Sequence, residues 1–256
     1  MAGALLETRG LRRFFGGIQA VKDVSLRLTE GHIVGLIGPN GAGKTTLFNL
    51  IAGAVPPQAG EVLFRGQTIT ARRPHAIARL GIARTFQTTR LFPEMTVLEN
   101  VMVGRHTRSR AGFLSGMLHL PHSRREEREI RDTALKLLEE FGLAERVEDA
   151  SGSLPFGLQR RVEIVRALAT EPALLLLDEP AAGLNIYETS ELSQLILRIR
   201  RRGVTCLVVE HDMSLVMEIS DQVIVLNEGM KIAEGTPREV QRNGDVVRIY
   251  LGAAHA

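Results

Sequence analysis

Apolar and polar positions alternate in the first part of the chain. Within residues 1–37, the stretches LLETRGLRRFF and AVKDVSLRLTEG read as strands, and HIVGLIG follows as a more continuously apolar one. Val24, Leu26 and Leu28 alternate with polar residues, which is typical of an antiparallel strand with one buried face. GEVLFRGQTIT predicts a further strand pair. We therefore expect an antiparallel sheet in the N-terminal region.

The pattern changes after residue 158, where short apolar runs alternate with helical periodicity. ALLLLDEP, VTCLVVEHD and QVIVLNEG read as strands, and ETSELSQLILRIRRRG reads as a helix between the first two. Buried strands that alternate with helices indicate a mainly parallel sheet covered on both faces.

Residues 92–150 differ from both regions, because they are rich in helix-forming and charged residues. The run RREERE mixes both signs and reads as a solvated helix face. The weakly periodic stretch RHTRSRAGFLSGMLHLP, near residues 106–123, reads as an insertion.

Composition narrows the class without deciding the function. The chain has 256 residues, 44% of them apolar, and only 4% are aromatic, so its core must rely on Leu, Ile, Val and Ala. The net charge of +3 is too small to indicate nucleic acid. The single cysteine, Cys206, lies in an apolar run and reads as a small buried residue that forms no internal disulfide. We see no signal peptide and no transmembrane segment, and we expect a cytoplasmic protein whose membrane role would come through a partner.

The sharpest local motif is GPNGAGKTT, which fits G-x-x-x-x-G-K-[ST] between an apolar strand and a predicted helix over 44–53. Its glycines let backbone N–H groups approach phosphate oxygens, and the helix dipole favours an anion. We expect Lys44 to bridge the outer two phosphates, Thr45 to ligate magnesium and Thr46 to hold the inner phosphate. The nucleotide-binding residues predicted here are Gly38, Pro39, Asn40, Gly41, Ala42, Gly43, Lys44, Thr45 and Thr46.

The stretch LLLLDEP places two acids at the carboxyl end of a buried strand. Such acids are costly without a cation or hydrogen-bond partners. We expect Asp178 to belong to a magnesium shell and Glu179, one residue further on, to act as the base for water that attacks the terminal phosphate.

The stretch SLPFGLQRR begins as a turn and continues as a helix with a positively polarised start. Apolar residues recur at helical spacing from Leu158, and no carboxylate precedes Glu163. These free N–H groups and the helix dipole suit an anion.

Together with three further elements in order, these motifs resemble the ATPase domain of ABC transporters. Gln87 in RTFQ matches the glutamine that joins the metal site to the helical subdomain, and His211 in VVEHD matches the histidine that contacts the terminal phosphate. Phe15 in RFFGG matches the aromatic residue that stacks on adenine. The resemblance implies ATP and Mg²⁺ as ligands, with Glu179, His211 and Gln87 as catalytic residues.

The resemblance also implies the fold class. It predicts an α/β P-loop NTPase with a RecA-like parallel-sheet core, an N-terminal antiparallel β subdomain and a helical subdomain. We place the core in residues 1–87 and 158–232, the helical subdomain in 88–157 and a C-terminal tail in 233–256.

Within the family, the chain is most similar to the ATPase subunits of branched-chain amino acid importers. The segments that carry this likeness are RTFQTTRLFPEMTVLENVMVG, LDEPAAGLN, EHDM and GTPREVQRNGDVVRIYLG. The resemblance implies membrane permease subunits, a second ATPase subunit in a homodimer or heterodimer, and indirectly a periplasmic solute-binding protein. It places the chain peripherally at the cytoplasmic face of the inner membrane. Related subunits serve urea or amide and lipopolysaccharide transporters, which remain alternatives.

The signature of the family, L-S-G-G-Q, is altered here to LPFGL. Pro155 replaces the serine, Phe156 the first glycine and Leu158 the glutamine, so only Gly157 remains to face the nucleotide of the partner subunit. We expect the phosphate contact to survive through backbone N–H groups. Asn185, in AAGLN, also stands where an aspartate is usual.

A permease docking surface is expected within Gln87–Gly104, although the same apolar residues could instead pack the core of the helical subdomain. The apolar residues concerned are Leu91, Phe92, Met95, Val97 and Met102.

Two other functions stay open. The first is an ABC ATPase that acts on nucleic acid or the ribosome, for which RIRRRG at residues 198–203 is the only basic block; such a block more often complements a helix dipole. The second is a nucleotide-dependent assembly switch with little hydrolysis, which the altered signature motivates.

Overall fold

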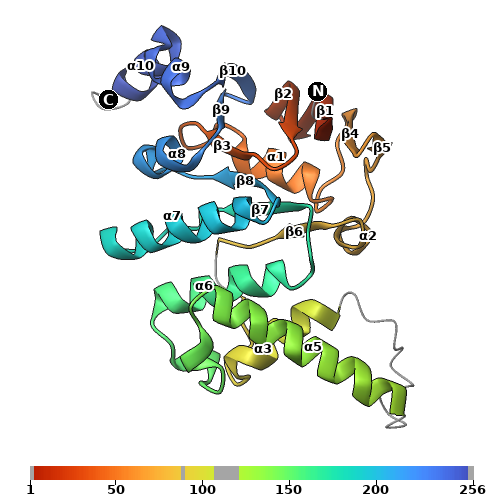
Figure 1. Ribbon diagram of the computed structural model, residues 1–256. Helices are drawn as coiled ribbons and strands as arrows, with labels where there is room; N and C mark the ends of the chain where they lie inside the picture. The colour runs from red at the N-terminus through yellow and green to blue at the C-terminus, as the bar shows by residue number, and fades with distance from the viewer. Residues whose placement is uncertain (1–2, 88–89, 107–120, 253–256) are drawn as a thin grey trace. The chain divides into compact units, whose positions relative to one another are not determined.

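The computed structural model describes residues 3–87, 90–106 and 121–252. The chain forms two compact units: Met1–Arg84 with Ala173–Ala256, and Thr85–Pro172 (Figure 1). These limits differ from the predicted boundaries at 87/88 and 157/158, chiefly because helix α6 (Phe156–Leu168) packs on α3 (Val97–His106) and so belongs to the second unit.

The first unit contains a four-stranded antiparallel sheet in the order β2-β1-β4-β5. Its strands are β1 (Ala4–Phe15), β2 (Ile18–Thr29), β4 (Ala59–Phe64) and β5 (Gln67–Thr68). The alternating residues Val24, Leu26 and Leu28 are all buried, as predicted. The period of two therefore places one face of this sheet on the core.

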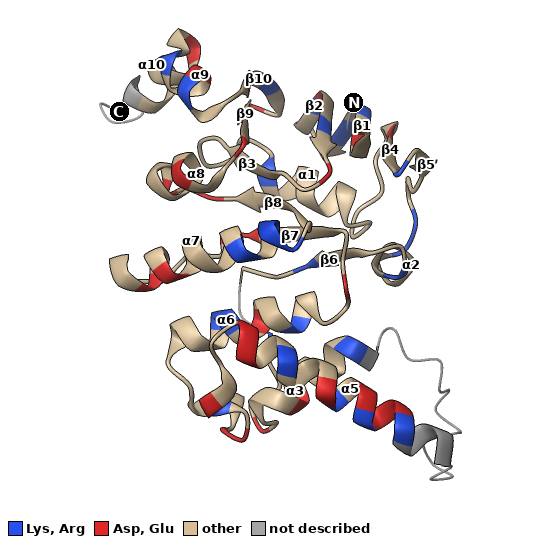
Figure 2. Ribbon diagram, in the orientation of Figure 1, with Lys and Arg blue, Asp and Glu red and all other residues tan. Residues whose placement is uncertain are grey.

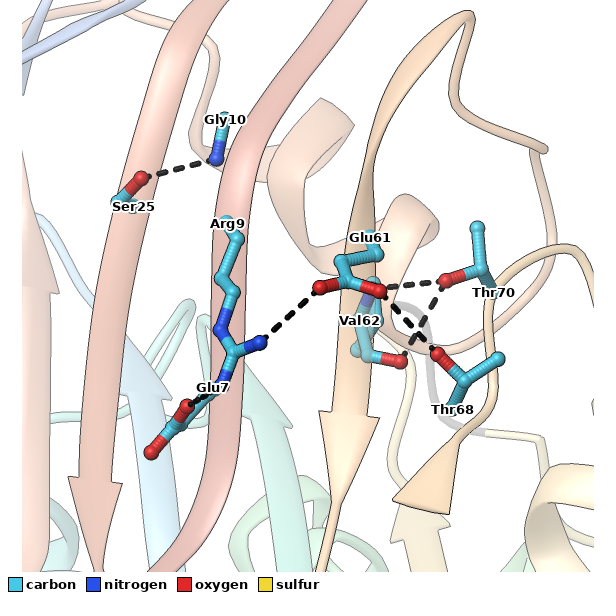
Figure 3. Close-up of polar contacts among 8 residues, drawn as sticks. All are labelled: Glu7, Arg9, Gly10, Ser25, Glu61, Val62, Thr68 and Thr70. Atoms are coloured by element: carbon cyan, nitrogen blue, oxygen red, sulfur yellow. Dashed lines mark hydrogen bonds and ion pairs between the residues drawn. The ribbon is translucent and has the colours of Figure 1, made fainter. Parts of the chain in front are cut away.

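Charged and hydroxyl side chains line the exposed face of the same sheet (Figure 3). The Arg9 guanidinium donates to Glu7 on its own strand at 2.9 Å and to Glu61 on β4 at 3.2 Å. Thr68 on β5 donates to the other Glu61 oxygen at 3.4 Å. Arg9 and Glu61 are direct cross-strand neighbours, so the pair supports the strand register, while exposed ion pairs of this kind add little stability.

The second sheet of this unit has six strands in the order β10-β9-β3-β8-β7-β6. They are β3 (Ile33–Ile37), β6 (Ile82–Arg84), β7 (Leu174–Asp178), β8 (Thr205–Val209), β9 (Gln222–Asn227) and β10 (Met230–Gly235). Only β10 pairs antiparallel to its neighbour; the other pairs are parallel. Every residue of β3, β7 and β8 is buried, which explains their uninterrupted apolar sequences.

Alternate residues of the parallel strands face two separate cores. On one face, Val34 and Leu36 join Leu47 and Phe48 of α1 (Lys44–Ile51) and the buried residues of the antiparallel sheet. This arrangement places α1 between the two sheets (Figure 1). The unit also contains α2 (Pro74–Arg79) and α7 (Ile186–Arg201).

The opposite face carries three short helices: α8 (Met213–Ile219), α9 (Pro237–Arg242) and α10 (Gly244–Gly252). Ile37 and Val216 pack there with Val240 and Val246. A side chain at Gly35 would lie 2.4 Å from Val216, so glycine allows α8 to approach β3 closely. The C-terminal segment 233–256, predicted as a tail, thus contributes α9 and α10 to a core of the first unit.

The second unit is helical. Besides α3 and α6 it contains α5 (Pro121–Glu140) and two 3₁₀ turns, η1 (Ala144–Arg146) and η2 (Ser151–Ser153). The charged residues of α5 alternate in sign along the helix (Figure 2), and Ile130, Ala134, Leu137 and Leu138 form its buried stripe. This confirms the solvated face predicted for RREERE. Most of the predicted insertion at 106–123 lies outside the described residues. None of the helices in the described part of the chain is long and apolar enough to cross a bilayer.

Candidate functional site

The predicted phosphate cradle is the loop between β3 and α1. Gly38, Gly41 and Gly43 have φ angles of 154°, 80° and 97°, which favour glycine. A Cβ atom would lie 2.2 Å from the Leu226 carbonyl oxygen at Gly38 and 2.3 Å from the Ala20 carbonyl oxygen at Gly43. Two of the three glycines are therefore required by close backbone contacts as well as by their dihedral angles.

Lys44 opens α1, and its side chain folds back over this loop. The Nζ atom donates to the carbonyl oxygens of Gly38 at 2.7 Å and Pro39 at 3.0 Å. Burial lowers the pKa of Lys44, and the nearby charge of Glu179 raises it. The loop carbonyl oxygens thus hold the ammonium group against the cradle. Of the next two residues, Thr45 is exposed and Thr46 is half-buried.

The acids and the histidine lie at the same edge of the sheet as the cradle. Strands β3, β8 and β7 are consecutive neighbours, and Leu36, Val209 and Asp178 pair across them. The carboxyl ends of parallel strands meet at one edge, where α/β sheets bind their ligands. The cradle after β3, the acids at the end of β7 and His211 after β8 are therefore brought together at one edge of the sheet.

Asp178 is buried and has a cationic partner. Arg84, at the end of β6, donates from Nη2 to Asp178 Oδ2 at 2.9 Å and from Nη1 to Asn49 of α1 at 2.7 Å. The guanidinium therefore supplies a charge-assisted hydrogen bond to the Asp178 carboxylate.

Glu179 and His211 contact each other directly. His211 Nε2 lies 2.7 Å from Glu179 Oε1, although 32 residues separate them. Glu179 has a φ of 46°, an uncommon value for a residue other than glycine, and its amide donates to the Val209 carbonyl oxygen at 2.9 Å. Non-glycine residues in this region cluster at functional sites, which agrees with the catalytic role predicted for Glu179.

Glu210 supplies a third carboxylate at this edge of the sheet, and it is buried. It accepts hydrogen bonds from the amides of Ala181 at 2.6 Å and His211 at 3.1 Å, and from the amide of Asp212. Burial raises the pKa of Glu210, the three amide bonds lower it, and the charge of Glu179 raises it further.

Phe15 lies at the end of β1, at the tip of the β1–β2 hairpin, and 46% of its surface is exposed. Arg13 stacks on the ring, with its guanidinium carbon 4.7 Å from the ring centroid. Ile18, which pairs with Phe15 across the hairpin, is also exposed. An exposed aromatic ring is available for stacking, as the resemblance predicts.

The altered signature forms a regular helix start in the second unit. α6 begins at Phe156 with Pro155 as its N-cap, and the Pro155 carbonyl oxygen accepts from the Gln159 amide at 3.0 Å. The amides of the first turn have no acceptor within the helix, and no acid lies in that turn. Gly157 sits inside the helix, so the replaced residues leave its N-terminal geometry intact.

Gln87 also belongs to the second unit, and α6 holds its main chain. Buried Arg160 donates to the carbonyl oxygens of Phe86 at 2.7 Å and Gln87 at 2.6 Å. Arg160 also pairs with Glu163 at 2.9 Å, whose carboxylate accepts from the amides of Phe86 and Arg90. The segment that carries Gln87 is thereby attached to the signature helix.

Asn185, which replaces the usual aspartate, caps α7. Its Oδ1 accepts from the Glu188 amide at 3.0 Å, and Glu188 Oε2 accepts from the Asn185 amide at 3.0 Å. Asn and Asp are about equally good at an N-cap, so the replacement preserves this local structure.

The predicted docking residues divide between surface and core. Phe92 and Met95 are exposed, Leu91 and Met102 are half-buried, and Val97 is buried. The side chain of Asn100 donates to the carbonyl oxygens of Phe92, Met95 and Thr96 and so fixes the loop that presents the two exposed residues. Val97 therefore packs the core of the helical unit, and the docking role of the exposed Phe92 and Met95 stays a prediction.

The basic block at 198–203 lies at the C-terminal end of α7 (Figure 2), where it complements the helix dipole. Arg200 also pairs with Asp221. These neighbours favour the structural interpretation of the block over nucleic-acid binding.

Three residues of the site were not predicted from the sequence. Arg84 is the first residue of RTFQ, Glu210 directly precedes His211, and Tyr250 belongs to the segment IYLG. Burial raises the pKa of the Tyr250 phenol, and a hydrogen bond with the backbone of Gly38 lowers it, so α10 contacts the first glycine of the cradle. The signal that could have pointed to Arg84 and Glu210 is their place inside the motifs RTFQ and VVEHD.

Comparison with known proteins agrees with this geometry. The ABC transporter family matches residues 21–182, and a branched-chain amino acid ATP-binding cassette transporter family matches residues 230–256. The chain is 47% identical to the high-affinity branched-chain amino acid transport ATP-binding protein BraF of Pseudomonas aeruginosa and 48% identical to LivG of Escherichia coli K12, described in the same terms. Each alignment covers 99% of this chain and 100% of the relative.

A solved structure shares the fold. It is an ATP-binding cassette of an ABC transporter in its ADP conformation, 34% identical, with a TM-score of 0.86 over 98% of this chain and 99% of that chain. Relatives within one family therefore match nearly the whole length of the chain. The chain belongs to the ABC transporter family and is an ATP-binding subunit that hydrolyses ATP.

Proposed function

We propose that this ATPase drives import of branched-chain amino acids, bound peripherally to permease subunits at the cytoplasmic face of the membrane. The observation that carries the substrate class is the match to BraF and LivG, which spans the full length of both relatives. A periplasmic binding protein would select the solute, and this chain would supply the energy.

In the proposed mechanism, the cradle amides and Lys44 bind the phosphates of ATP. The three glycines leave the loop backbone accessible, and Lys44 would turn from the Gly38 and Pro39 carbonyl oxygens toward the outer two phosphates. Phe15 would stack on the adenine ring.

The residues expected to hold Mg²⁺ are Thr45, Asp178 and, through the helical unit, Gln87. Hydroxyl, carboxylate and amide oxygens suit this ion, which commonly takes one or two carboxylates together with substrate phosphates. When bound, it neutralises charge on the outer phosphates. Arg84 would orient Asp178 for this role through its ion pair of 2.9 Å with Asp178 Oδ2.

Glu179 would take the proton of the attacking water, and His211 would contact the terminal phosphate. The 2.7 Å contact between the two side chains supports this pairing, because it sets the base and the phosphate-binding group at a defined spacing. The site would be completed by the N-terminus of α6 from a second ATPase subunit, whose first-turn amides face the same phosphate.

The test of the base is Glu179→Gln in the full-length chain. We expect ATP to bind with unchanged affinity, turnover to fall about 100-fold or more, and an ATP-dependent dimer to accumulate. Glu61→Gln, which makes the same change on the exposed face of the antiparallel sheet, is the control. Turnover of the Glu179 variant within twofold of the control would remove Glu179 as the base.

The test of the substrate class is transport by the assembled system. The chain would be produced with its permease and binding protein in vesicles, and uptake of labelled leucine, isoleucine and valine would be compared with uptake of urea. ATP-dependent uptake of urea without uptake of the three amino acids would contradict the proposal.

A further inference from the structure

Two turns of the site lie next to each other, one after β7 and one after β8. The first turn carries Glu179 and continues through Ala181, and the second carries Glu210 and His211. The side chains of Glu179 and His211 contact each other through a hydrogen bond of 2.7 Å between two flexible groups. Further bonds must hold the two turns at a fixed spacing if Glu179 and His211 are to meet in the same way in every catalytic cycle.

The backbone supplies one such link. The Glu179 amide donates to the carbonyl oxygen of Val209, the last residue of β8, at 2.9 Å. This bond extends the pairing of β7 with β8 by one residue beyond Asp178. It fixes the beginning of the first turn and leaves the rest of that turn unsupported by the sheet.

The Glu210 carboxylate supplies the other link. Its Oε1 accepts from the Ala181 amide at 2.6 Å, across the gap between the turns, while Oε2 accepts from the His211 amide at 3.1 Å within its own turn. The residue is 4% exposed, whereas His211 and Asp212, the next two residues in the chain, are exposed. An acidic side chain is costly in such a place unless its hydrogen bonds are made.

We propose that Glu210 is a positioning residue that clamps the Glu179 turn to the His211 turn and so sets the geometry of the catalytic pair. Two links then support the side-chain contact: the backbone bond from the Glu179 amide to Val209, and the bond from the Ala181 amide to the Glu210 carboxylate. The inference rests on the catalytic roles proposed above for Glu179 and His211, and Glu210 itself touches neither nucleotide nor water in this scheme.

The clamp needs both carboxylate oxygens as acceptors, so a substitution by glutamine tests it directly. Glu210→Gln keeps the size of the side chain but replaces one acceptor by an NH₂ group, which would face an amide donor. One of the two turns must therefore be released. A misplacement of about 1 Å in a catalytic group can cost about 100-fold in rate, so we expect kcat for ATP to fall about 10- to 100-fold while the affinity for ATP stays within about threefold.

A matched control comes from the other end of the same strand. Thr205 begins β8, is fully buried, and accepts a hydrogen bond from the Gly31 amide at 2.8 Å. Thr205→Val is isosteric and also removes one buried acceptor of a backbone amide, yet it lies at the edge of the sheet opposite the cradle. We expect a similar loss of thermal stability in this variant with kcat within twofold of the native value.

A double-mutant cycle separates positioning from general stability. In the His211→Ala background, Glu210→Gln has no histidine left to position, so its effect on kcat should shrink to less than about threefold. If Glu210→Gln does not fold, Glu210→Asp replaces it, because the shorter carboxylate still reaches its own turn but not the Ala181 amide. The same separation of kcat from affinity is expected.

The outcomes distinguish this inference from the function on which it rests. If His211→Ala keeps native turnover, the proposed role of His211 is wrong. If His211→Ala is inactive while Glu210→Gln behaves like Thr205→Val, or if Glu210→Gln lowers kcat equally in both backgrounds, Glu210 is only a structural residue and the clamp is refuted.

Discussion

The cradle and the signature turn are both glycine-containing turns that open a helix toward phosphate, yet they tolerate change differently. The cradle needs glycine at Gly43, where φ is 97° and a Cβ atom would lie 2.3 Å from a backbone oxygen. The signature turn has lost its serine and first glycine, and α6 still begins regularly at Phe156. The difference is one of backbone conformation: the cradle uses dihedral angles that side chains exclude, whereas the signature turn uses only the free amides of an ordinary helix start.

The largest expected difference, in stability and in ATP binding, is between substitutions of Gly43 in the cradle and Gly157 in the signature turn. Gly43→Ala should lower the free energy of unfolding by about 3 kcal/mol and abolish measurable ATP binding, because the dihedral angle and the Ala20 contact both oppose a side chain. Gly157→Ala, inside α6, should leave ATP binding by the isolated chain unchanged. Urea unfolding and equilibrium ATP binding of both variants would measure the contrast, and equal losses in the two would break it.

The next effect concerns charge in the cradle. Lys44→Ala removes the ammonium that now binds two loop carbonyl oxygens, and a hydrogen bond to a charged group is worth about 1.5–3 kcal/mol. ATP affinity should therefore fall about 10- to 100-fold. The control is Lys231→Ala on β10, which makes the same charge change where the lysine pairs with Glu234. A loss as large in the control would mean that the effect arises from net charge.

A smaller effect is expected from restoring the usual serine in the signature turn. Pro155→Ser returns one hydroxyl and one N–H group next to the phosphate-binding amides. In the Glu179→Gln background it should lengthen the lifetime of the ATP-bound dimer roughly tenfold, which corresponds to one additional hydrogen bond to a charged group. Dimer dissociation followed by size-exclusion chromatography would show this. An unchanged lifetime would mean that backbone amides alone already satisfy the phosphate.

The smallest effect uses Cys206 as a reporter of the first unit. Burial raises the pKa of this thiol to about 12, because desolvation disfavours the thiolate. At pH 8 the folded chain should react with a thiol reagent only through unfolding, which restores an ordinary pKa of about 8.5. Gly43→Ala should speed labelling of Cys206, and Gly157→Ala, in the second unit, should not. Fast labelling of the native chain at pH 8 would contradict this burial.

Much of the fold followed from local patterns. The alternation around Val24 and the uninterrupted apolar strands β3, β7 and β8 identified the two sheets, because burial on one face or on both leaves different periods in a sequence. The extent of the helical unit was less predictable. α6 begins beside a turn that resembles a boundary, and only its packing on α3 and its bonds to the Phe86–Gln87 backbone assign it to the second unit. The C-terminal helices likewise gave no sign of their partners on α8 and β9.

What the sequence alone determined was the chemistry that neighbouring residues share: a glycine loop before Lys44, and two acids at the end of one strand. A phosphate cradle is built from consecutive backbone amides, so its residues must be adjacent in the chain. Tertiary structure alone decided which distant groups meet, as with Arg84 on Asp178, Glu179 beside His211, and Glu210 between two turns. These contacts arise from the order and register of strands in a parallel sheet, and long-range pairing of that kind leaves no local pattern in the sequence.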